Sequence, residues 1–129
     1  MLSKLHKQFS LYLQLSTLHT RQSQLPEDEL QFVKFPYKRE FKFTDCKKKR
    51  LLPFDFCLWY NLSNRVLIEI DGELHYKQNS RLEEIQSNDA YKTRYCEYKN
   101  IPLFRIPYWE FNESEDYKKS IFSFIHRQQ

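Results

Sequence analysis

The sequence contains a single glycine, Gly72, among its 129 residues. Glycine-rich loops that cradle phosphate groups, such as the P-loop and the dinucleotide fingerprint, need several glycines at fixed spacing. Both kinds of nucleotide site are therefore excluded. No apolar run approaches the ~18 residues that a membrane-spanning helix requires, so the sequence excludes a membrane span as well.

Cysteine is scarce and irregularly spaced, with only Cys46, Cys57 and Cys96 in the chain. The number is odd and no two cysteines form a CxxC pair, so neither a disulfide framework nor a zinc finger is indicated. We expect reduced thiols and an intracellular, cytoplasm-like compartment.

Acidic residues are missing from residues 1–25, where apolar side chains recur at helical spacing at Leu2, Leu5, Phe9 and Leu13. We expect an amphipathic helix that packs on a sheet. The composition also resembles an organellar transit segment, which leaves an organelle as the alternative location.

Basic residues are abundant but unevenly placed. The chain is 40% hydrophobic and 29% charged, which suits one domain spanning residues 1–129. Its net charge is only +4, yet residues 38–50 hold seven Lys and Arg side chains against two acidic ones. A local basic stripe favours a polyanion such as nucleic acid. A solvated lysine-rich loop is the alternative interpretation.

Hydrophobic periodicity and turn residues predict four strands and two helices after the N-terminal segment. We expect the strands at residues 36–44, Phe54–Trp59, Arg65–Asp71 and 101–106, and the helices at residues 81–99 and 112–127. Asn112 is expected to cap the C-terminal helix. The order helix, three strands, helix, strand, helix predicts an α/β fold.

Acidic residues lie on one face only of the second and third predicted strands. Because side chains alternate along a strand, Asp55 lies on one face of the second strand, and Glu69 and Asp71 share one face of the third. The opposite faces are apolar, with Phe54, Phe56 and Leu58 on the second strand and Val66, Ile68 and Ile70 on the third.

A hairpin between these strands brings the acids together. A turn centred on Leu62 places Asp55 opposite Glu69, and a turn centred on Ser63 places Asp55 opposite Asp71. In either register the facing Cβ atoms lie ~4.5–5.5 Å apart. Clustered carboxylates repel one another, so they require basic side chains or a divalent cation. We favour the cation, because Mg²⁺ prefers oxygen ligands.

Two features follow the acids directly. Gly72 comes after Asp71, and we expect it to adopt a backbone conformation closed to other residues or to allow a close backbone approach. His75 lies four residues beyond Asp71, which makes it a candidate for proton transfer or for contact with a phosphate.

The predicted helix at residues 81–99 carries two charges on its inward stripe. The stripe runs at helical spacing through Leu82, Ile85, Asp89, Lys92 and Cys96. Two interpretations remain open for Lys92. It either reaches the acid cluster or forms an i,i+3 ion pair with Asp89.

Four segments of the chain together resemble the PD-(D/E)XK nuclease superfamily. They are Pro53-Phe54-Asp55-Phe56, Ile68-Glu69-Ile70-Asp71-Gly72-Glu73-Leu74-His75-Tyr76, Asp89-x-x-Lys92-x-x-Tyr95-Cys96 and Leu103-Phe104-Arg105-Ile106-Pro107-Tyr108. The order is most similar to that of small phage and mobile-element endonucleases akin to very-short-patch repair enzymes. The resemblance spans residues 36–111.

This resemblance implies a restriction-endonuclease-like core, a mixed sheet of about four strands flanked by helices. It also implies an endonuclease that hydrolyses DNA with Mg²⁺ or Mn²⁺. Asp55 and Glu69 match the two acids of the motif, and the implied metal-binding positions are Asp55, Glu69 and Ile70. The third motif position holds Asp71 in place of the usual lysine. The implied catalytic set is therefore Asp55, Glu69, Asp71, His75 and Lys92, with Arg105 as a further source of positive charge and Glu40 as an additional acid.

DNA is the implied partner, and a homodimer is expected if the enzyme makes double-strand breaks. Candidate contacts to backbone phosphates are Lys47, Lys48, Lys49, Arg50 and Arg105. Tyr76 and Trp109 are candidates for stacking on bases. The alternative function is a catalytically inactive nucleic-acid-binding module of the same fold, which the missing motif lysine favours.

Overall fold

The computed structural model describes Lys7 and residues 35–128. The helix or targeting segment predicted at residues 1–25 lies outside the described residues. None of the helices in the described part is long and apolar enough to cross a membrane.

Four strands, two α-helices and two short 3₁₀ turns make up the described chain. Their bounds are β1 Tyr37–Phe41, β2 Phe54–Trp59, β3 Arg65–Asp71, η2 Glu73–His75, α3 Leu82–Lys99, β4 Leu103–Pro107, η3 Tyr108–Glu110 and α4 Asp116–Gln128. The predicted bounds of β2 and β3 are confirmed, whereas β1 is shorter than the predicted strand at residues 36–44 and β4 begins later than predicted.

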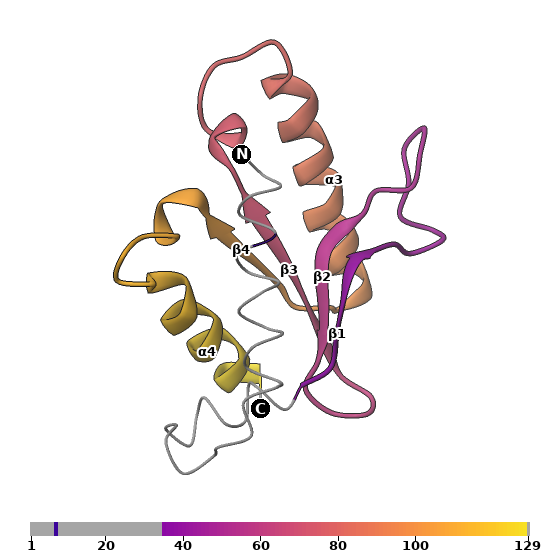
Figure 1. Ribbon diagram of the computed structural model, residues 1–129. Coiled ribbons are helices and arrows are strands. Elements are labelled where there is room, and N and C mark those ends of the chain that lie inside the picture. Colours follow the sequence, from indigo (N-terminus) through magenta and orange to yellow (C-terminus); the bar gives the residue numbers. More distant parts are fainter. Residues whose placement is uncertain (1–6, 8–34, 129) are drawn as a thin grey trace.

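The strands form one mixed sheet in the order β1-β2-β3-β4. β1, β2 and β3 pair antiparallel, and β4 pairs parallel to β3. A parallel neighbour requires a crossover connection, which α3 provides (Figure 1). The prediction of a mixed four-stranded sheet with helices is therefore confirmed.

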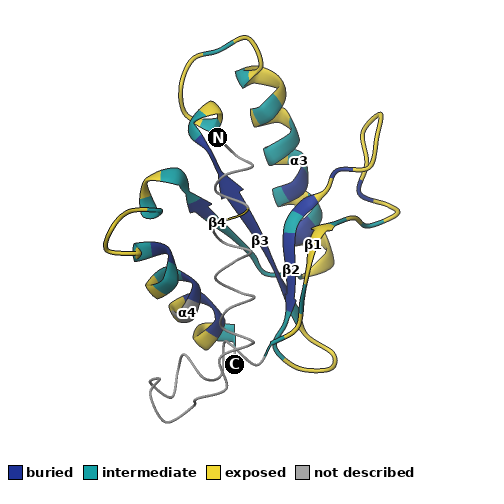
Figure 2. Ribbon diagram, viewed as in Figure 1, coloured by how far each residue is buried: buried dark blue, intermediate teal, exposed yellow. Residues whose placement is uncertain are grey.

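The two α-helices cover opposite faces of the sheet (Figure 1). α4 buries its apolar stripe against one face, in a core formed by Phe56, Leu58, Val66, Ile68, Ile70, Ile106, Tyr117, Ile121, Phe124 and Ile125. α3 covers the other face over a smaller core of Cys46, Leu52, Phe54, Cys57, Leu67 and Cys96. The most buried strands are β2 and β3 at the centre of the sheet (Figure 2). All three cysteines are buried free thiols.

The face predicted for Phe54 is wrong. Phe54 joins the core under α3, whereas Phe56 and Leu58 join the core under α4. The physical reason is a break in the strand ladder at this end of β2. There the Asp55 N–H donates to the Glu69 side chain and the Ile70 N–H donates to the Asp55 side chain. Because side chains replace the ladder bonds, the alternation of faces is interrupted.

The C-terminal helix begins at Asp116 rather than at residue 112. Asn112 instead starts a turn, in which its Oδ1 accepts the Asp116 N–H at 3.3 Å and Glu115 adopts a left-handed φ of 53°. The delayed start of β4 has a similar cause. Asn100 ends α3 with a left-handed φ of 57°, a conformation that asparagine tolerates, and two further residues reverse the chain before Leu103.

The conformation predicted for Gly72 is also wrong. Its φ of −74° and ψ of −177° are extended and open to any residue. The glycine is buried where the chain leaves β3 for η2. The alternative that Gly72 allows a close backbone approach is compatible with this burial.

Candidate active site at the ends of the central strands

Asp55 and Glu69 face each other across β2 and β3. The register pairs Phe56 with Ile68, which corresponds to the turn centred on Leu62 and confirms the first of the two predicted alternatives. The Asp55 N–H donates to Glu69 Oε1 at 3.0 Å. The Ile70 N–H donates to Asp55 Oδ2 at 2.7 Å. These two bonds fix both carboxylates and bring the main chain of Ile70 beside them.

Lys92 reaches this acid pair from α3. Its Nζ donates to Glu69 Oε1 at 3.2 Å and to Oε2 at 3.1 Å. The prediction that Lys92 points to the acid cluster is confirmed, and the alternative ion pair with Asp89 is wrong. Both partners are buried, since Glu69 is 3% and Lys92 9% exposed. The Lys92 ammonium also lies 5.4 Å from the centre of the Phe54 ring, which shields it from water.

The carboxyl group of Glu69 holds its proton unusually well. Burial and the neighbouring charge of Asp55 raise the pKa of Glu69 to about 7, and Lys92 and Arg105 only partly offset this increase. The basic side chains around Glu69 therefore do not outweigh the effect of burial on its carboxyl group. A further positive charge at this site would stabilise the ionised form.

A second group of side chains lies at the end of β3. His75 Nδ1 lies 2.7 Å from Asp89 Oδ2 and 3.6 Å from Asp71 Oδ1. Asp71 is buried at 5% exposure, while Asp89 and His75 are partly buried. Three elements meet here, because Asp71 ends β3, His75 belongs to η2 and Asp89 projects from α3.

Arg105 of β4 connects the acids of this group. Its guanidinium lies 3.3 Å from Asp71 Oδ1 and 3.4 Å from Asp89 Oδ1. It also donates to the Asp89 carbonyl at 3.0 Å and to Thr93 Oγ1 at 3.3 Å. The parallel register, which pairs Glu69 with Arg105, places this side chain between β3 and α3. The predicted contact of Arg105 with a DNA phosphate remains a prediction.

The pKa shifts in the second group follow from these contacts. Burial raises the pKa of Asp71 despite the charges of Arg105 and His75. The hydrogen bond to Asp89 raises the pKa of His75 against the opposing effect of burial. Burial acts to raise the pKa of Asp89, but the bond from His75 and the charge of Arg105 outweigh it and leave that pKa lowered. Together these shifts favour a protonated His75 paired with an ionised Asp89.

Asp71, His75 and Asp89 form a possible metal-binding group. One ligand atom from each lies within 4.8 Å of the others. The sequence prediction placed the metal at Asp55, Glu69 and Ile70 and did not include Asp89. The signal that could have identified Asp89 was its place on the inward stripe of α3. The charge of Asp55 acts on both Glu69 and Asp71, so the two groups belong to one electrostatic site.

The basic residues Lys47, Lys48, Lys49 and Arg50 are exposed in the loop between β1 and β2. Lys48 Nζ donates to Ser87 Oγ of α3 at 2.8 Å. At the base of the loop, the Asp45 carboxylate accepts the Tyr95 hydroxyl at 2.5 Å and lies 3.0 Å from Lys99 Nζ. Contacts with Ser87 and Tyr95 therefore fix the basic loop to α3, the helix whose Lys92 contacts the acid cluster.

Glu40 is exposed on the edge strand β1, with a left-handed φ of 49°. The register of β1 and β2 places it level with Asp55. Among the described residues, Glu40 forms no hydrogen bond or ion pair with the acid cluster. Its role as an additional acid remains a prediction.

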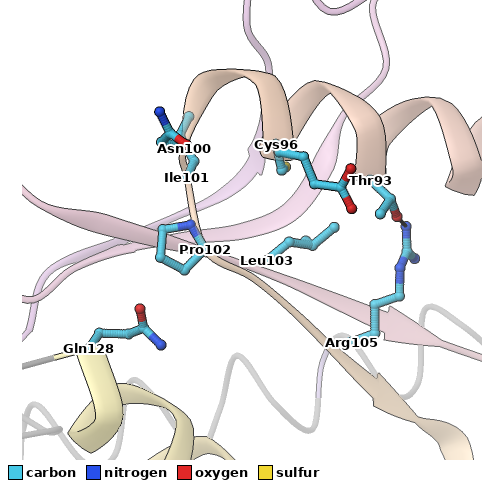
Figure 3. Close-up of a pocket in the computed structure, with 9 residues that line it drawn as sticks. Thr93, Cys96, Asn100, Ile101, Pro102, Leu103, Arg105 and Gln128 are labelled. Carbon is cyan, nitrogen blue, oxygen red and sulfur yellow. Dashed lines mark hydrogen bonds between the residues drawn. The ribbon is translucent and has the colours of Figure 1, made fainter.

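The outer edge of β4 borders an open pocket of about 790 Å³. Figure 3 shows Thr93 on one wall, Leu103 along the floor and Gln128 of α4 on the opposite side. Arg105, whose guanidinium contacts Asp71 and Asp89, lies at one end of the residues drawn. The pocket and the acid cluster therefore meet at this one side chain.

Comparisons of the chain with protein-family models, with curated proteins and with solved structures found no match. The function is therefore argued from the geometry and electrostatics of the acid cluster.

Proposed function

We propose that this protein is a metal-dependent endonuclease that hydrolyses DNA phosphodiester bonds on a restriction-endonuclease-like core. The observation that carries the proposal is the pair of carboxylates, Asp55 and Glu69, held on neighbouring strands with Lys92 against Glu69. The lysine that the nuclease motif places at position 71 is supplied here from α3. The site therefore keeps a positive charge even though Asp71 stands where the motif has a lysine.

The balance of acidic and basic side chains at the site favours the binding of a divalent cation. Four carboxylates, those of Asp55, Glu69, Asp71 and Asp89, are set against the charges of Lys92 and Arg105. With all four carboxylates ionised, the cluster keeps a net negative charge even when His75 is protonated. Burial is the main cause of the raised pKa values of Glu69 and Asp71, and the neighbouring acids add to it. A cation bound beside them would favour their ionised forms. Carboxylate oxygens are the ligands that suit Mg²⁺ and Mn²⁺.

The residues of the cluster fit the chemistry of phosphodiester hydrolysis. Asp55 and Glu69, with the adjacent main chain of Ile70, would hold the cation, which lowers the pKa of bound water and neutralises charge on the phosphate. Lys92 brings a fixed positive charge to the position where negative charge develops. His75 is oriented by its bond to Asp89, and its imidazole can donate or accept a proton. Asp71 positions Arg105 and His75.

The basic loop at residues 47–50 is the proposed contact with the DNA backbone. It is exposed and lies on the α3 side of the sheet, as does the acid cluster. Lysine and arginine side chains in such a position release counterions from DNA and supply affinity without sequence preference. The site thus combines a surface for binding with a centre for hydrolysis.

A second candidate function is a DNA-binding module without activity. The ion pairs favour it, because Lys92 contacts both oxygens of Glu69 and Arg105 contacts both Asp71 and Asp89. These ion pairs neutralise much of the negative charge of the cluster without a metal cation. The pair of carboxylates held side by side on neighbouring strands is the reason to prefer the nuclease.

Incubation of supercoiled plasmid with the purified protein tests the proposal. We expect relaxed or linear DNA with Mg²⁺ or Mn²⁺, no cleavage with EDTA, and no cleavage by Asp55→Asn with either metal. Glu113→Gln is the matched control, since it removes an exposed acid outside the cluster. Binding of plasmid without any metal-dependent cleavage by the wild-type protein would instead support the inactive module.

A further inference from the structure

A pocket of about 510 Å³ lies where β3 begins, at the end of that strand away from Asp71. Its walls come from the β2–β3 turn, the last turns of α3 and the base of the β1–β2 loop. The β2–β3 turn and the C-terminal end of α3 lie at the same end of the sheet (Figure 1). Ligand sites commonly have volumes of this order, and none of the described residues that line this pocket belongs to the acid cluster.

Arg65, the first residue of β3, brings a positive charge to the pocket. Its guanidinium carbon lies 4.8 Å from the centre of the Phe43 ring and 5.6 Å from that of the Phe41 ring. Contacts of this kind hold the guanidinium group by its flat face and leave the N–H groups at its edge to bind other partners. In the described part of the chain, no hydrogen bond or ion pair engages Arg65. Its N–H donors are therefore open to a ligand.

The acidic side chain that lines the pocket, Asp45, is already paired. It accepts a hydrogen bond from the Tyr95 hydroxyl at 2.5 Å, and Lys99 Nζ lies 3.0 Å from its other carboxylate oxygen. Both contacts lower the pKa of Asp45, so this carboxylate is ionised at neutral pH. Arg65 and Lys99 set against Asp45 leave the described lining of the pocket with a net positive charge.

Neutral hydrogen-bond donors lie beside these charges. Ser63 and Asn64 line the pocket, and their main-chain N–H groups donate to Asn61 Oδ1 at 2.9 and 2.8 Å, which fixes the turn. Within the described residues, the Ser63 hydroxyl and the Asn64 side-chain amide form no hydrogen bond, so both can donate to a ligand. The C-terminal end of α3 carries a partial negative charge, but the Asn100 N–H donates to two of its carbonyl groups.

We propose that this pocket binds one phosphate group through Arg65 and Lys99, with Ser63 and Asn64 as neutral donors. Guanidinium groups bind phosphate through two parallel N–H bonds, and the edge of the Arg65 guanidinium is open for this contact. A metal cation does not suit the pocket, because the two basic side chains would repel it. The proposal does not rest on the proposed nuclease function.

Two sources can supply the phosphate group, a free phosphate compound and the backbone of DNA. The pocket lies on the α3 side of the sheet, since Phe43 and Tyr95 pack against the core under α3. Lys99 follows Lys92 by two turns of α3, or about 10 Å. This distance corresponds to about three nucleotides of a DNA strand. A strand that passes the acid cluster along α3 therefore carries a phosphate at this range.

Titration of inorganic phosphate into the isotope-labelled protein, at constant ionic strength, tests the pocket without DNA. We expect saturable changes in the NMR signals of the Arg65 side-chain N–H and of the Ser63 and Asn64 amides. Ser63→Asp places a negative charge at an exposed position of the turn and should weaken phosphate binding about tenfold. Ser63→Asn is the matched control, which keeps a neutral donor and should bind as the wild-type protein does.

DNA in which one phosphate at a time is replaced by an uncharged methylphosphonate tests the second source. In EDTA, fluorescence anisotropy should show one position where the replacement weakens wild-type binding about tenfold. The same replacement should have no effect on binding by Arg65→Gln, which has already lost that contact. Lys119→Gln removes an exposed charge of α4 and should keep the wild-type pattern.

The two measurements together decide the proposal. Saturable phosphate binding that Ser63→Asp weakens supports it for a free phosphate compound, and a DNA position coupled to Arg65 supports it for the DNA backbone. Ser63→Asp replaces Arg65→Gln in the DNA measurement if loss of the contacts with Phe41 and Phe43 unfolds that variant. Phosphate signals that do not saturate or that Ser63→Asp leaves unchanged, together with DNA profiles identical in wild type and variant, would overturn the proposal. None of these outcomes depends on cleavage, so the pocket and the nuclease can fail separately.

Discussion

The pairing of Lys92 with Glu69 is the contact that defines the site at the scale of single residues. A lysine and a glutamate, both almost fully buried, contact each other through two hydrogen bonds from two different elements. Burial removes hydration from both charges, and their attraction offsets this loss only while both partners are present. Lys92 therefore favours the ionised form of Glu69, which burial alone would disfavour.

Replacement of Lys92 tests its part in the chemistry. We expect Lys92→Met to slow DNA cleavage by about a hundredfold per folded molecule, the scale of one lost charge-stabilising donor. The measurement is the rate of cleavage with enzyme in excess over DNA, corrected for the folded fraction by circular dichroism. A rate within a few-fold of the wild type would show that Lys92 has only a structural role.

The ion pair between Lys92 and Glu69 also leads to a prediction about the stability of the fold. Removing one partner of a buried pair destabilises a protein by about 3–5 kcal/mol, so Lys92→Met should unfold at a lower urea concentration. The double variant Lys92→Met/Glu69→Gln should recover part of this loss, because no unpaired buried carboxylate remains. Additive effects of the two single substitutions would contradict the pairing.

The sequence predicted most residues of the site, but it did not predict Asp89 or the contacts that join the second group. The acids of β2 and β3 follow from strand alternation and from a short turn, both of which are local properties, and so does the inward position of Lys92 on α3. The contacts among Asp89, His75 and Arg105 depend on the β3–β4 register and on how α3 docks. Neither of these is determined by residues close together in the sequence.

The interrupted ladder between β2 and β3 is the main feature at the scale of secondary structure. The carboxylates of Asp55 and Glu69 accept backbone N–H groups where ladder bonds would otherwise form. The two side chains are thereby held by the backbone itself. This explains how two acids remain side by side despite their repulsion.

At the same scale, the exposed lysines of the loop between β1 and β2 lead to a prediction about DNA binding. Changing Lys47, Lys48 and Lys49 to Gln should weaken DNA binding and lower the slope of log affinity against log salt by roughly 0.9 for each lost phosphate contact. A matched triple variant at Lys118, Lys119 and Arg127 of α4, on the opposite face, should leave the slope unchanged. Equal effects of the two triple variants would show that the loop has no special contact with DNA.

The accuracy of the predicted element bounds depended on local signals. β2 and β3 have the expected bounds because Pro53 and the turn at residues 60–64 limit them on both sides. The starts of β4 and α4 were misplaced because Asn100 and Glu115 adopt left-handed conformations. Such a conformation is uncommon outside glycine, and little in the sequence indicates that Glu115 adopts it.

At the scale of the whole molecule, the two faces of the sheet differ, since one carries the larger hydrophobic core and the other carries the acid cluster. The larger core lies under α4, and the acids, the basic loop and α3 lie on the other side. Mutations in the larger core should therefore change stability more than chemistry.

Ile121 tests this separation. Ile121→Ala removes a fully buried side chain of α4 and should lower the free energy of unfolding by about 2–5 kcal/mol. Urea denaturation measures this loss, and the cleavage rate per folded molecule should stay near that of the wild type. A large loss of that rate under conditions where the variant is folded would mean that the two faces are coupled.

The most direct test of the proposed chemistry is a single-turnover comparison of the wild-type protein with Asp55→Asn. With Mg²⁺, and with protein in excess over a labelled oligonucleotide and well above the dissociation constant, all DNA is bound, so the rate reports hydrolysis alone. We expect Asp55→Asn to bind the DNA as tightly as the wild type and to cleave it at least about a hundredfold more slowly. Equal cleavage rates for the two proteins, or cleavage by the wild type that persists in EDTA, would contradict a metal-dependent nuclease centred on Asp55 and Glu69.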